Sequence, residues 1–315
     1  MKGYLLIFCF LFIVLTSHIS LKSASPFTFE KSSQGVKLSE NGNPVFFYQK
    51  MPKSLNGKYI CNNYFHPLYS LKGDTLTEEF PSDHPYHRGI FWAWHQMYIN
   101  GKSVGDGWIM ENIRQEVVDV QAIPKPNLSQ LKLRVLWKSP LFEKDKPFLK
   151  EHTTITVYAL QKGVRRIDFT ISLNALVPGV EIGGSNDEKG YGGLCVRFKL
   201  PKNLTFTSVD GPVIPNISQI NAGPYMDFSG SFGKSGETVG AAIFCYPQTP
   251  NYPQPWILRS VTSMQNIVFP GKKRILLTMG HPVVLQYRLI VHNGNAQSLN
   301  LPGFQSEYEK TPIME

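Results

Sequence analysis

Cysteine is scarce in this chain: 315 residues contain four, and Cys9 lies in the apolar run near the N-terminus. The other three, Cys61, Cys195 and Cys245, are an odd number, so at least one has no partner within the chain. Their wide separation excludes a compact zinc motif built on paired cysteines, and a domain of this size needs no disulfide framework. We expect buried, unreactive thiols, and their pairing stays open.

Acidic residues are also in the minority, with 23 Asp and Glu against 32 Lys and Arg and a formal charge of +9. The basic residues are scattered, and the sequence has no long basic run or nucleic-acid motif, so we expect no nucleic-acid partner. Attraction of an acidic polysaccharide and ordinary solvated charge are both compatible with this balance.

Long apolar runs are absent after the N-terminus. Residues 1–25 contain Lys2, an apolar run over Leu5–Leu15 and then small and polar residues, which predicts a signal peptide. The run is shorter than the roughly 20 residues that span a bilayer, although an uncleaved anchor is the alternative. No cysteine follows it as in a lipoprotein. We expect residues 26–315 to form a periplasmic or secreted domain without an integral membrane part.

Long helical periodicity is absent too, whereas 26 Gly and 23 Pro favour turns. Apolar side chains alternate with polar ones over 131–137 and 167–173, as in half-buried strands. The turn cluster Glu40–Asn43 contains Asn-Gly and predicts a hairpin between Gly35–Leu38 and Val45–Gln49.

Further strands are expected at Thr153–Leu160, Gly193–Leu200, Val239–Cys245, Arg274–Met279 and Val283–His292. Neither a repeat nor a linker divides the chain. The sequence therefore predicts an all-β fold, a large antiparallel two-sheet β-sandwich in a single domain over 26–315.

Chemistry-bearing residues concentrate between His66 and Gln96, which hold four of the eight histidines. At their centre is Asp83-His84-Pro85-Tyr86-His87-Arg88-Gly89, in which Pro85 keeps His84 out of the helical region. Imidazoles beside carboxylates supply proton transfer near neutral pH, although they can also tie down a loop. The catalytic candidates are Asp83, His84, His87 and Glu79.

A metal site has weaker support, because the zincin spacing H-E-x-x-H is absent. If Arg88–Gln96 is one unbroken strand, His87 and His95 lie roughly 26 Å apart and cannot share an ion. Any site must then recruit distant partners, namely His66, Glu79 or Asp187. We predict no cofactor and leave a divalent metal open.

The same strand hypothesis divides the side chains between two faces. One face carries Arg88, Trp92, Trp94 and Gln96, and the other carries His87, Phe91, Ala93 and His95. Arg88 is a candidate to hold an anionic group or oxyanion, and the two tryptophans could stack on pyranose rings. Core packing of this strand, His95 included, is the alternative.

A second candidate segment is the glycine-rich Gly183–Gly193, which does not match a phosphate-binding loop. It could bring Asp187, Lys189 and Tyr191 to a cleft, or it could be only a turn. The full set of substrate-binding candidates is Arg88, Trp92, Trp94, His95, Gln96, His66, Asp187, Lys189 and Tyr191.

The strings His66–Tyr69, Leu76–Pro81, Asp83–Gly89 and Phe91–Gln96 together resemble the bacterial DUF6807 family, often labelled PmoA, as do Asp187–Gly193 and Tyr287–His292. The resemblance covers nearly all of residues 26–315. It implies a Bacteroidetes-like secreted protein found with carbohydrate-degrading systems, and a galactose-mutarotase-like supersandwich. Methane oxidation is rejected because it would require several spanning helices.

The leading hypothesis is a carbohydrate-active enzyme, a glycoside hydrolase or lyase, that acts on an oligosaccharide or polysaccharide with His, Asp and Glu as acid and base. A lyase needs a histidine base and an arginine clamp, whereas a hydrolase is expected to pair two carboxylates. The alternatives are a non-catalytic glycan-binding protein and a metal-dependent oxidoreductase built on the histidines.

Overall fold

The computed structural model of the chain describes residues 25–233 and 236–311. The predicted signal peptide, apart from Ser25, lies outside the described residues. Within these ranges, the search for a helix with the length and hydropathy of a membrane span finds none.

Two large antiparallel sheets form the body of the molecule. The eight-stranded sheet has the order β1 (Phe27–Lys31), β2 (Gly35–Glu40), β3 (Asn43–Gln49), β6 (Tyr64–Leu68), β7 (Ile90–Trp94), β15 (Gly192–Val196), β21 (Gln265–Val268) and β20 (Trp256–Ile257). The nine-stranded sheet has the order β10 (Arg114–Pro124), β11 (Leu128–Lys138), β12 (Leu149–Tyr158), β13 (Val164–Ala175), β23 (Val283–Asn293), β19 (Val239–Cys245), β18 (Tyr225–Gly230), β16 (Thr205–Ser208) and β17 (Gly211–Pro212).

Two smaller sheets complete the strands. One has the order β22 (Ile275–Leu277), β14 (Val180–Gly183), β8 (Gln96–Ile99) and β9 (Lys102–Gly105). The other is the hairpin of β4 (Lys53–Leu55) and β5 (Lys58–Cys61). Beyond them lie a short 3-10 turn, η1 (Ala296–Ser298), and the helix α1 (Leu301–Glu309).

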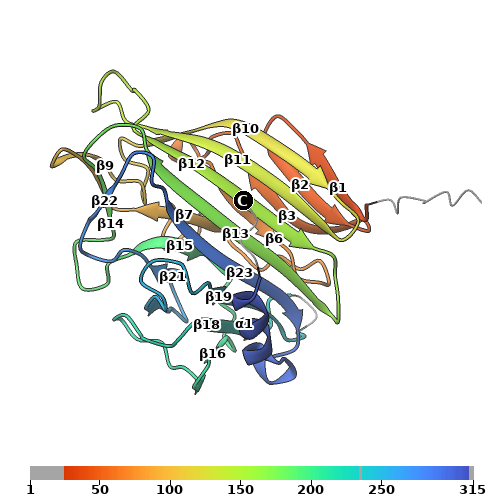
Figure 1. Cartoon of the computed structure of the whole chain (residues 1–315). Helices are drawn as coiled ribbons and strands as arrows, with labels where there is room; N and C mark the ends of the chain where they lie inside the picture. The colour runs from red at the N-terminus through yellow and green to blue at the C-terminus, as the bar shows by residue number, and fades with distance from the viewer. Residues whose placement is uncertain (1–24, 234–235, 312–315) are drawn as a thin grey trace, which may run out of the picture.

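The main core lies between the two large sheets, and the long yellow, green and blue strands of one cross the red and orange strands of the other in Figure 1. Leu38 and Phe65 from the eight-stranded sheet join the same buried cluster as Val135 and Ile171 from the nine-stranded sheet. Burial of two apolar faces against each other is what holds a sandwich together. The predicted all-β sandwich is confirmed.

The period-two segments behave as expected. Alternate residues of β11 and β13 are buried in the core. They are Leu131, Leu133, Val135 and Trp137 on β11, and Ile167, Phe169, Ile171 and Leu173 on β13. The predicted hairpin is β2–β3, and its turn residues Asn41 and Gly42 have φ of 49° and 79°. Positive φ at both positions is the geometry that selects Asn-Gly.

At one corner, three connections between consecutive strands run between the eight-stranded and the four-stranded sheet. They are β7 to β8, β14 to β15 and β21 to β22, and the neighbours β7-β15-β21 continue as β8-β14-β22. The strand expected over Arg88–Gln96 is therefore wrong as a single unit, because His95 occupies the break between β7 and β8. Side chains at this corner are released from the regular alternation of a strand.

The last helix or strand of the described residues is α1, which the sequence pattern did not predict. It has only nine residues, too few for a visible apolar period, and its start is fixed by Asn300, whose side chain accepts a hydrogen bond from the Gly303 amide at 3.0 Å. The helix packs through Leu301 and Tyr308 on a small cluster with Phe244 and Ile290.

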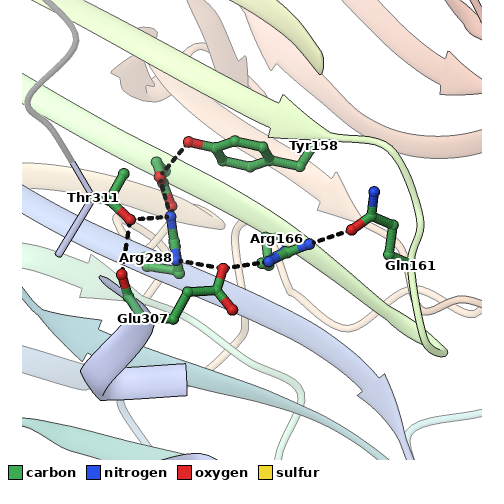
Figure 2. A network of polar contacts seen from close by, with 7 residues as sticks. Tyr158, Gln161, Arg166, Arg288, Glu307 and Thr311 are labelled. Carbon is green, nitrogen blue, oxygen red and sulfur yellow. Dashed lines mark hydrogen bonds and ion pairs between the residues drawn. The ribbon is translucent and has the colours of Figure 1, made fainter. Parts of the chain in front are cut away.

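Ion pairs also hold α1 to the nine-stranded sheet. Figure 2 shows Glu307 between Arg166 and Arg288, and the guanidinium of Arg288 donates to the carboxylate of Asp168 on β13 at 2.6 and 2.8 Å. Desolvation of buried Arg288 opposes its charge, but the contact with Asp168 outweighs it and raises the pKa of Arg288.

The three described cysteines, Cys61, Cys195 and Cys245, are free and buried, as expected. Burial raises the pKa of the Cys61 thiol to about 11 and the pKa of the other two as well. A thiol that stays protonated is a poor nucleophile, so these cysteines are packing residues.

Candidate functional site

A polar hollow of about 250 Å³ opens at the corner where the strands change sheets. Its lining comes from five separate segments of the chain. The lining residues are His84, Tyr86, His87, His95, Trp108, Lys189, Tyr191, Arg259, Thr262 and Ser263. Of the sequence-predicted site residues, the structure brings His84, His87, His95, Lys189 and Tyr191 together here.

The loop that carries His84 and His87 is closed at its base by backbone contacts. The Phe80 amide donates to the His87 carbonyl at 3.0 Å, and the His87 amide donates to the His84 carbonyl at 2.9 Å across a turn that contains Pro85. Gly89 then has φ of +43°, and a Cβ there would meet the Phe65 carbonyl oxygen at 2.0 Å. Only glycine fits this position, which explains the His-Arg-Gly ending of the motif.

Asp83 orients His84 from outside the hollow. Its Oδ2 lies 2.9 Å from His84 Nδ1, and both carboxylate oxygens accept hydrogen bonds from Arg197, at 3.0 and 2.8 Å. Partial burial opposes the carboxylate charge, but the bonds from the Ser263 amide, His84 and Arg197 hold the pKa of Asp83 well below its usual range. Asp83 is therefore a fixed anion that positions the imidazole.

His87 lies beneath His84, with the two rings stacked at 4.6 Å and an interplanar angle of 1°. It is only 2% exposed, and its Nδ1 has no hydrogen-bond partner among the described residues. Burial and the positive charge of His84 and Arg197 lower the pKa of His87 to about 2. The ring is therefore uncharged at neutral pH and can accept a hydrogen bond, but with a pKa this low it serves as neither a general acid nor a general base there.

His95 forms a second imidazole–carboxylate pair. Its Nδ1 lies 2.7 Å from Oδ2 of Asp106, whose other oxygen accepts from the backbone amides of Trp108 at 2.8 Å and Ile109 at 3.2 Å. The Trp108 ring stacks on His95 at 4.9 Å and 17°. The ring is thus held by a contact at Nδ1 and by a stacked face, and no hydrogen bond joins its Nε2 to another described residue.

The expected separation of His87 and His95 is wrong, because the strand between them is broken. Trp108 contacts both rings, with centroids 6.4 Å from His87 and 4.9 Å from His95. The two histidines therefore lie much closer than an extended strand would place them. The chain turns at His95 to enter β8, and this turn returns the side chain to the hollow.

The rest of the lining includes basic and aromatic side chains. Asp187 shapes its loop, because Oδ1 accepts from the Ser185 hydroxyl at 2.7 Å and the Lys189 amide at 3.0 Å. Lys189 and Tyr191 then line the hollow while Asp187 does not. The guanidinium of Arg259, over the Tyr191 ring at 5.7 Å, is the second cation. None of the described lining residues is a carboxylate.

Several predicted binding residues lie elsewhere. Trp92 and Trp94 point into the core between the sheets, at 1% and 0% exposure, so they cannot stack on a sugar in this structure. Phe91 and Ala93 point to the other side, toward Trp108. The predicted alternation over β7 is right, but the tryptophans are on the packing face because inter-sheet burial favours the largest apolar side chains.

Arg88 and Gln96 have structural contacts. The buried Arg88 donates to the carbonyls of Tyr86 at 3.2 Å and Trp108 at 3.1 Å, and it covers the Phe91 ring at 4.2 Å. It fixes the two loops of the hollow rather than facing into it. Gln96 donates to the carbonyls of Gly184 and Lys272. Both side chains are committed to backbone acceptors.

Glu79 and His66 lie outside the hollow. Glu79 forms an ion pair with Lys53 and accepts a hydrogen bond from Tyr64. His66 contacts the Thr77 hydroxyl at 3.0 Å, and burial lowers its pKa to about 4. Neither the catalytic candidate Glu79 nor the binding candidate His66 therefore lines the hollow.

Five important side chains escaped the sequence reasoning: Asp106, Trp108, Arg197, Arg259 and Ser263. Each comes from a segment far from the histidine motif. One local pattern could have suggested two of these residues. It is Asp106-Gly107-Trp108, in which an acid and an aromatic residue flank a glycine directly after a short strand. Pairing of Asp106 with His95 depends on the sheet change, which no local pattern shows.

A metal centre has no donor set in the part of the chain that the structure describes, since no three His, Cys, Asp or Glu side chains are grouped closely enough. A larger cavity of about 700 Å³ lies elsewhere, but no imidazole lines it. Acid–base chemistry therefore points to the smaller histidine hollow.

Comparison with known proteins identifies the family of this chain. No curated protein matches the chain. A family model described as a family of unknown function, DUF6807, matches residues 35–302, which include every residue that lines the hollow. The chain belongs to the DUF6807 family.

Proposed function

We propose that this protein is a carbohydrate lyase, which cleaves an acidic or oxidised sugar by proton abstraction and elimination. The single observation that carries the proposal is the presence of two imidazole–carboxylate pairs, His84–Asp83 and His95–Asp106, at one hollow. Two positioned imidazoles supply one acid and one base, which is what an elimination requires.

The two pairs differ in charge, and this difference favours His95 as the base. Asp83 shares its charge with Arg197, whereas Asp106 has backbone amides and His95 as its described partners. The Asp106 charge is therefore available to stabilise a proton on His95. His84, in its protonated form, is the acid.

The proposed reaction is a β-elimination across two neighbouring carbons of the sugar ring. His95 Nε2 removes the proton from the carbon next to a carboxylate or keto group, and that electron pair forms a carbon–carbon double bond. The bond from the neighbouring carbon to the glycosidic oxygen breaks, and His84 gives its proton to the departing oxygen. Lys189 and Arg259 stabilise the negative charge that builds up on the substrate carbonyl or carboxylate.

The lining also favours elimination over two-carboxylate hydrolysis. Glycosidases generally pair two carboxyl groups across the scissile bond, and no described residue of the lining is Asp or Glu. Burial raises the pKa of Tyr86 and Tyr191, so both phenols stay protonated and can donate hydrogen bonds to sugar oxygens. With two cations and no anion, the hollow suits a uronate or keto-sugar unit.

We also propose that the protein works in the periplasm or outside the cell, as the N-terminal sequence suggests. The function is tested by incubating it with a panel of oligosaccharides that includes uronates and keto-glycosides, and measuring the products by mass spectrometry. Fragments whose masses sum to that of the substrate support a lyase. Water uptake supports a hydrolase, and binding without a product supports a glycan-binding protein.

A further inference from the structure

Four basic side chains gather on the outer face of the nine-stranded sheet. Lys132 and Arg134 lie on β11, and Lys150 and His152 lie on β12, with their side chains pointing away from the core. The two strands are neighbours (Figure 1), and Arg134 lies directly opposite His152 in the register. Arg134 and His152 are exposed, whereas the two lysines are half-buried. We call these four residues the basic strip.

The cations of the basic strip have no counter-ion. Within the described residues, its two lysines and its arginine form no ion pair and no side-chain hydrogen bond. The carboxylates that border the strip on the edge strand β10 are engaged with other side chains. Glu116 pairs with Lys138, and Asp119, which lies opposite Arg134 in the register, accepts a hydrogen bond from Gln121 at 2.8 Å. The strip therefore keeps a net positive charge.

The charges of the strip also repel one another. Lys132 and Arg134 are two residues apart on one strand, roughly 7 Å along it. Lys150 is a diagonal neighbour of Arg134 on the adjacent strand. Burial and then the charges of Lys150 and Arg134 lower the pKa of His152. Because like charges on neighbouring strands destabilise a sheet, a bound anion would relieve this repulsion.

The surroundings of the strip favour an extended partner that carries hydroxyl groups. None of the strip residues lines the histidine hollow or the larger cavity, so they meet an anion on an open sheet face. Thr154, Thr170 and Ser172 continue this face, and their hydroxyls form no hydrogen bond within the described residues. The apolar neighbour Leu136 is half-buried. Hydroxyl groups suit a sugar, whereas nucleic-acid bases stack on aromatic rings and bilayers take up protruding apolar groups.

We propose that the basic strip is a surface binding site for an acidic polysaccharide built of uronate units. The carboxylates of successive sugars contact Lys132, Arg134 and Lys150, and the sugar hydroxyls bond to the hydroxyl side chains of β12 and β13. The anionic class of the partner follows from the strip alone, and the choice of a uronate polymer rests on the proposed function. A second contact of this kind keeps a long chain close to the protein between cleavages.

Binding of polygalacturonate, measured by calorimetry at low and high salt, tests the proposal. The measurement uses His95→Gln, in which cleavage is expected to be slow. Arg134→Thr together with Lys150→Thr, added to this background, removes two charges and keeps residues that favour strands. Affinity at low salt should fall by about tenfold in the pair and by about threefold in each single variant, as for exposed ion pairs. High salt should reduce these differences.

The matched control is Lys58→Thr together with Lys102→Thr in the same background. Both lysines are exposed on strands outside the strip, and their loss changes the net charge equally. The control should bind polygalacturonate as His95→Gln does, dextran should bind to none of the proteins, and urea denaturation should show that all of them fold.

Equal weakening by the two pairs of variants would show an effect of net charge alone and overturn the proposal. Absence of polygalacturonate binding at low salt, or unchanged affinity in Arg134→Thr with Lys150→Thr, would overturn it too. Tighter strip-dependent binding of phosphatidylglycerol vesicles than of polygalacturonate would assign the face to a membrane instead. Binding is read without cleavage, so failure to find a lyase product leaves the result unaffected.

Discussion

The histidine hollow and the α1 network of Figure 2 both gather polar and charged side chains, but they use them differently. Around α1, Arg288 packs on the Tyr308 ring at 4.5 Å and forms ion pairs with Asp168 and Glu307. These ion pairs hold the helix to the nine-stranded sheet. In the hollow, the His84 and His95 rings are held at Nδ1 by Asp83 and Asp106, and no hydrogen bond joins either Nε2 to another described residue. A dense set of charged groups is therefore a site only where some of its bonding capacity remains unused.

The largest expected effect is loss of turnover in His95→Gln. Removal of the proposed base should lower kcat by about 10²- to 10⁴-fold while the free energy of unfolding changes little, because the ring is partly exposed. Product formation by mass spectrometry and urea denaturation measure the two quantities. His281→Gln, at an exposed histidine outside the hollow, is the control. Full activity of His95→Gln would reverse the proposed roles.

The opposite pattern is expected for the α1 network. Arg288→Met leaves Asp168 without its buried partner and should lower the free energy of unfolding by about 3 kcal/mol. Activity per folded molecule should stay at the wild-type level, because Arg288 is outside the hollow. The free energy of unfolding, from urea denaturation, and the turnover rate are measured on the same samples. The contrast is contradicted if Arg288→Met and His95→Gln change these two quantities in the same way.

Parts of the fold that depend on local sequence could be predicted. Period-two apolar patterns predicted β11 and β13, and Asn-Gly predicted the β2–β3 hairpin, because local conformation and burial set both. The pattern over Arg88–Gln96 also gave the correct faces for Phe91 and Trp92. The sequence pattern showed that one face of this segment is buried, but it did not show which part of the protein covers that face.

Candidate side chains could be predicted from the sequence, but the contacts between them could be predicted only within the motif. His84 and His87 stand next to Asp83 in the chain, so their neighbourhood could be read directly. Asp106 reaches His95 through a change of sheet, and Arg197 reaches Asp83 across 114 residues. Such contacts are set by long-range strand order, which a single sequence without internal repeats does not reveal.

A third test concerns pH. The folded pKa of His87, about 2, is below its unfolded value of about 6.5, so the unfolded chain binds about one more proton between these limits. The stability that neutral His87 provides is complete above the unfolded value and is lost as pH falls. His87→Gln should lower the slope of unfolding free energy against pH by about 1.4 kcal/mol per unit between about pH 4.5 and 6.

Urea denaturation of both proteins at several pH values gives these slopes, with His281→Gln as the matched control. Asp83 and His66 contribute in the same direction, but they are present in both proteins and cancel in the difference. Equal slopes for the wild type and His87→Gln would show that His87 is not buried in its neutral form.

The smallest effect is expected from a single cation of the hollow. Lys189→Met should raise KM for an acidic substrate by about fivefold, the size of a partly exposed charge pair, and should leave KM for a neutral substrate unchanged. The KM values of the two substrates, measured at low and high salt, separate charge from shape. Lys272→Met, whose side chain pairs with exposed Glu188 and does not line the hollow, is the control.

The most direct measurement of the central claim is turnover of a uronate oligosaccharide in water enriched in heavy oxygen. Proton removal by His95 and protonation of the leaving oxygen by His84 predict an unsaturated fragment and a second fragment, which at early times carry no solvent oxygen beyond the slow exchange at their reducing ends, measured on the isolated products. His95→Gln should form them about 10²- to 10⁴-fold more slowly. Heavy oxygen incorporated at cleavage beyond that exchange, or product formation by the variant at the wild-type rate, would contradict the account.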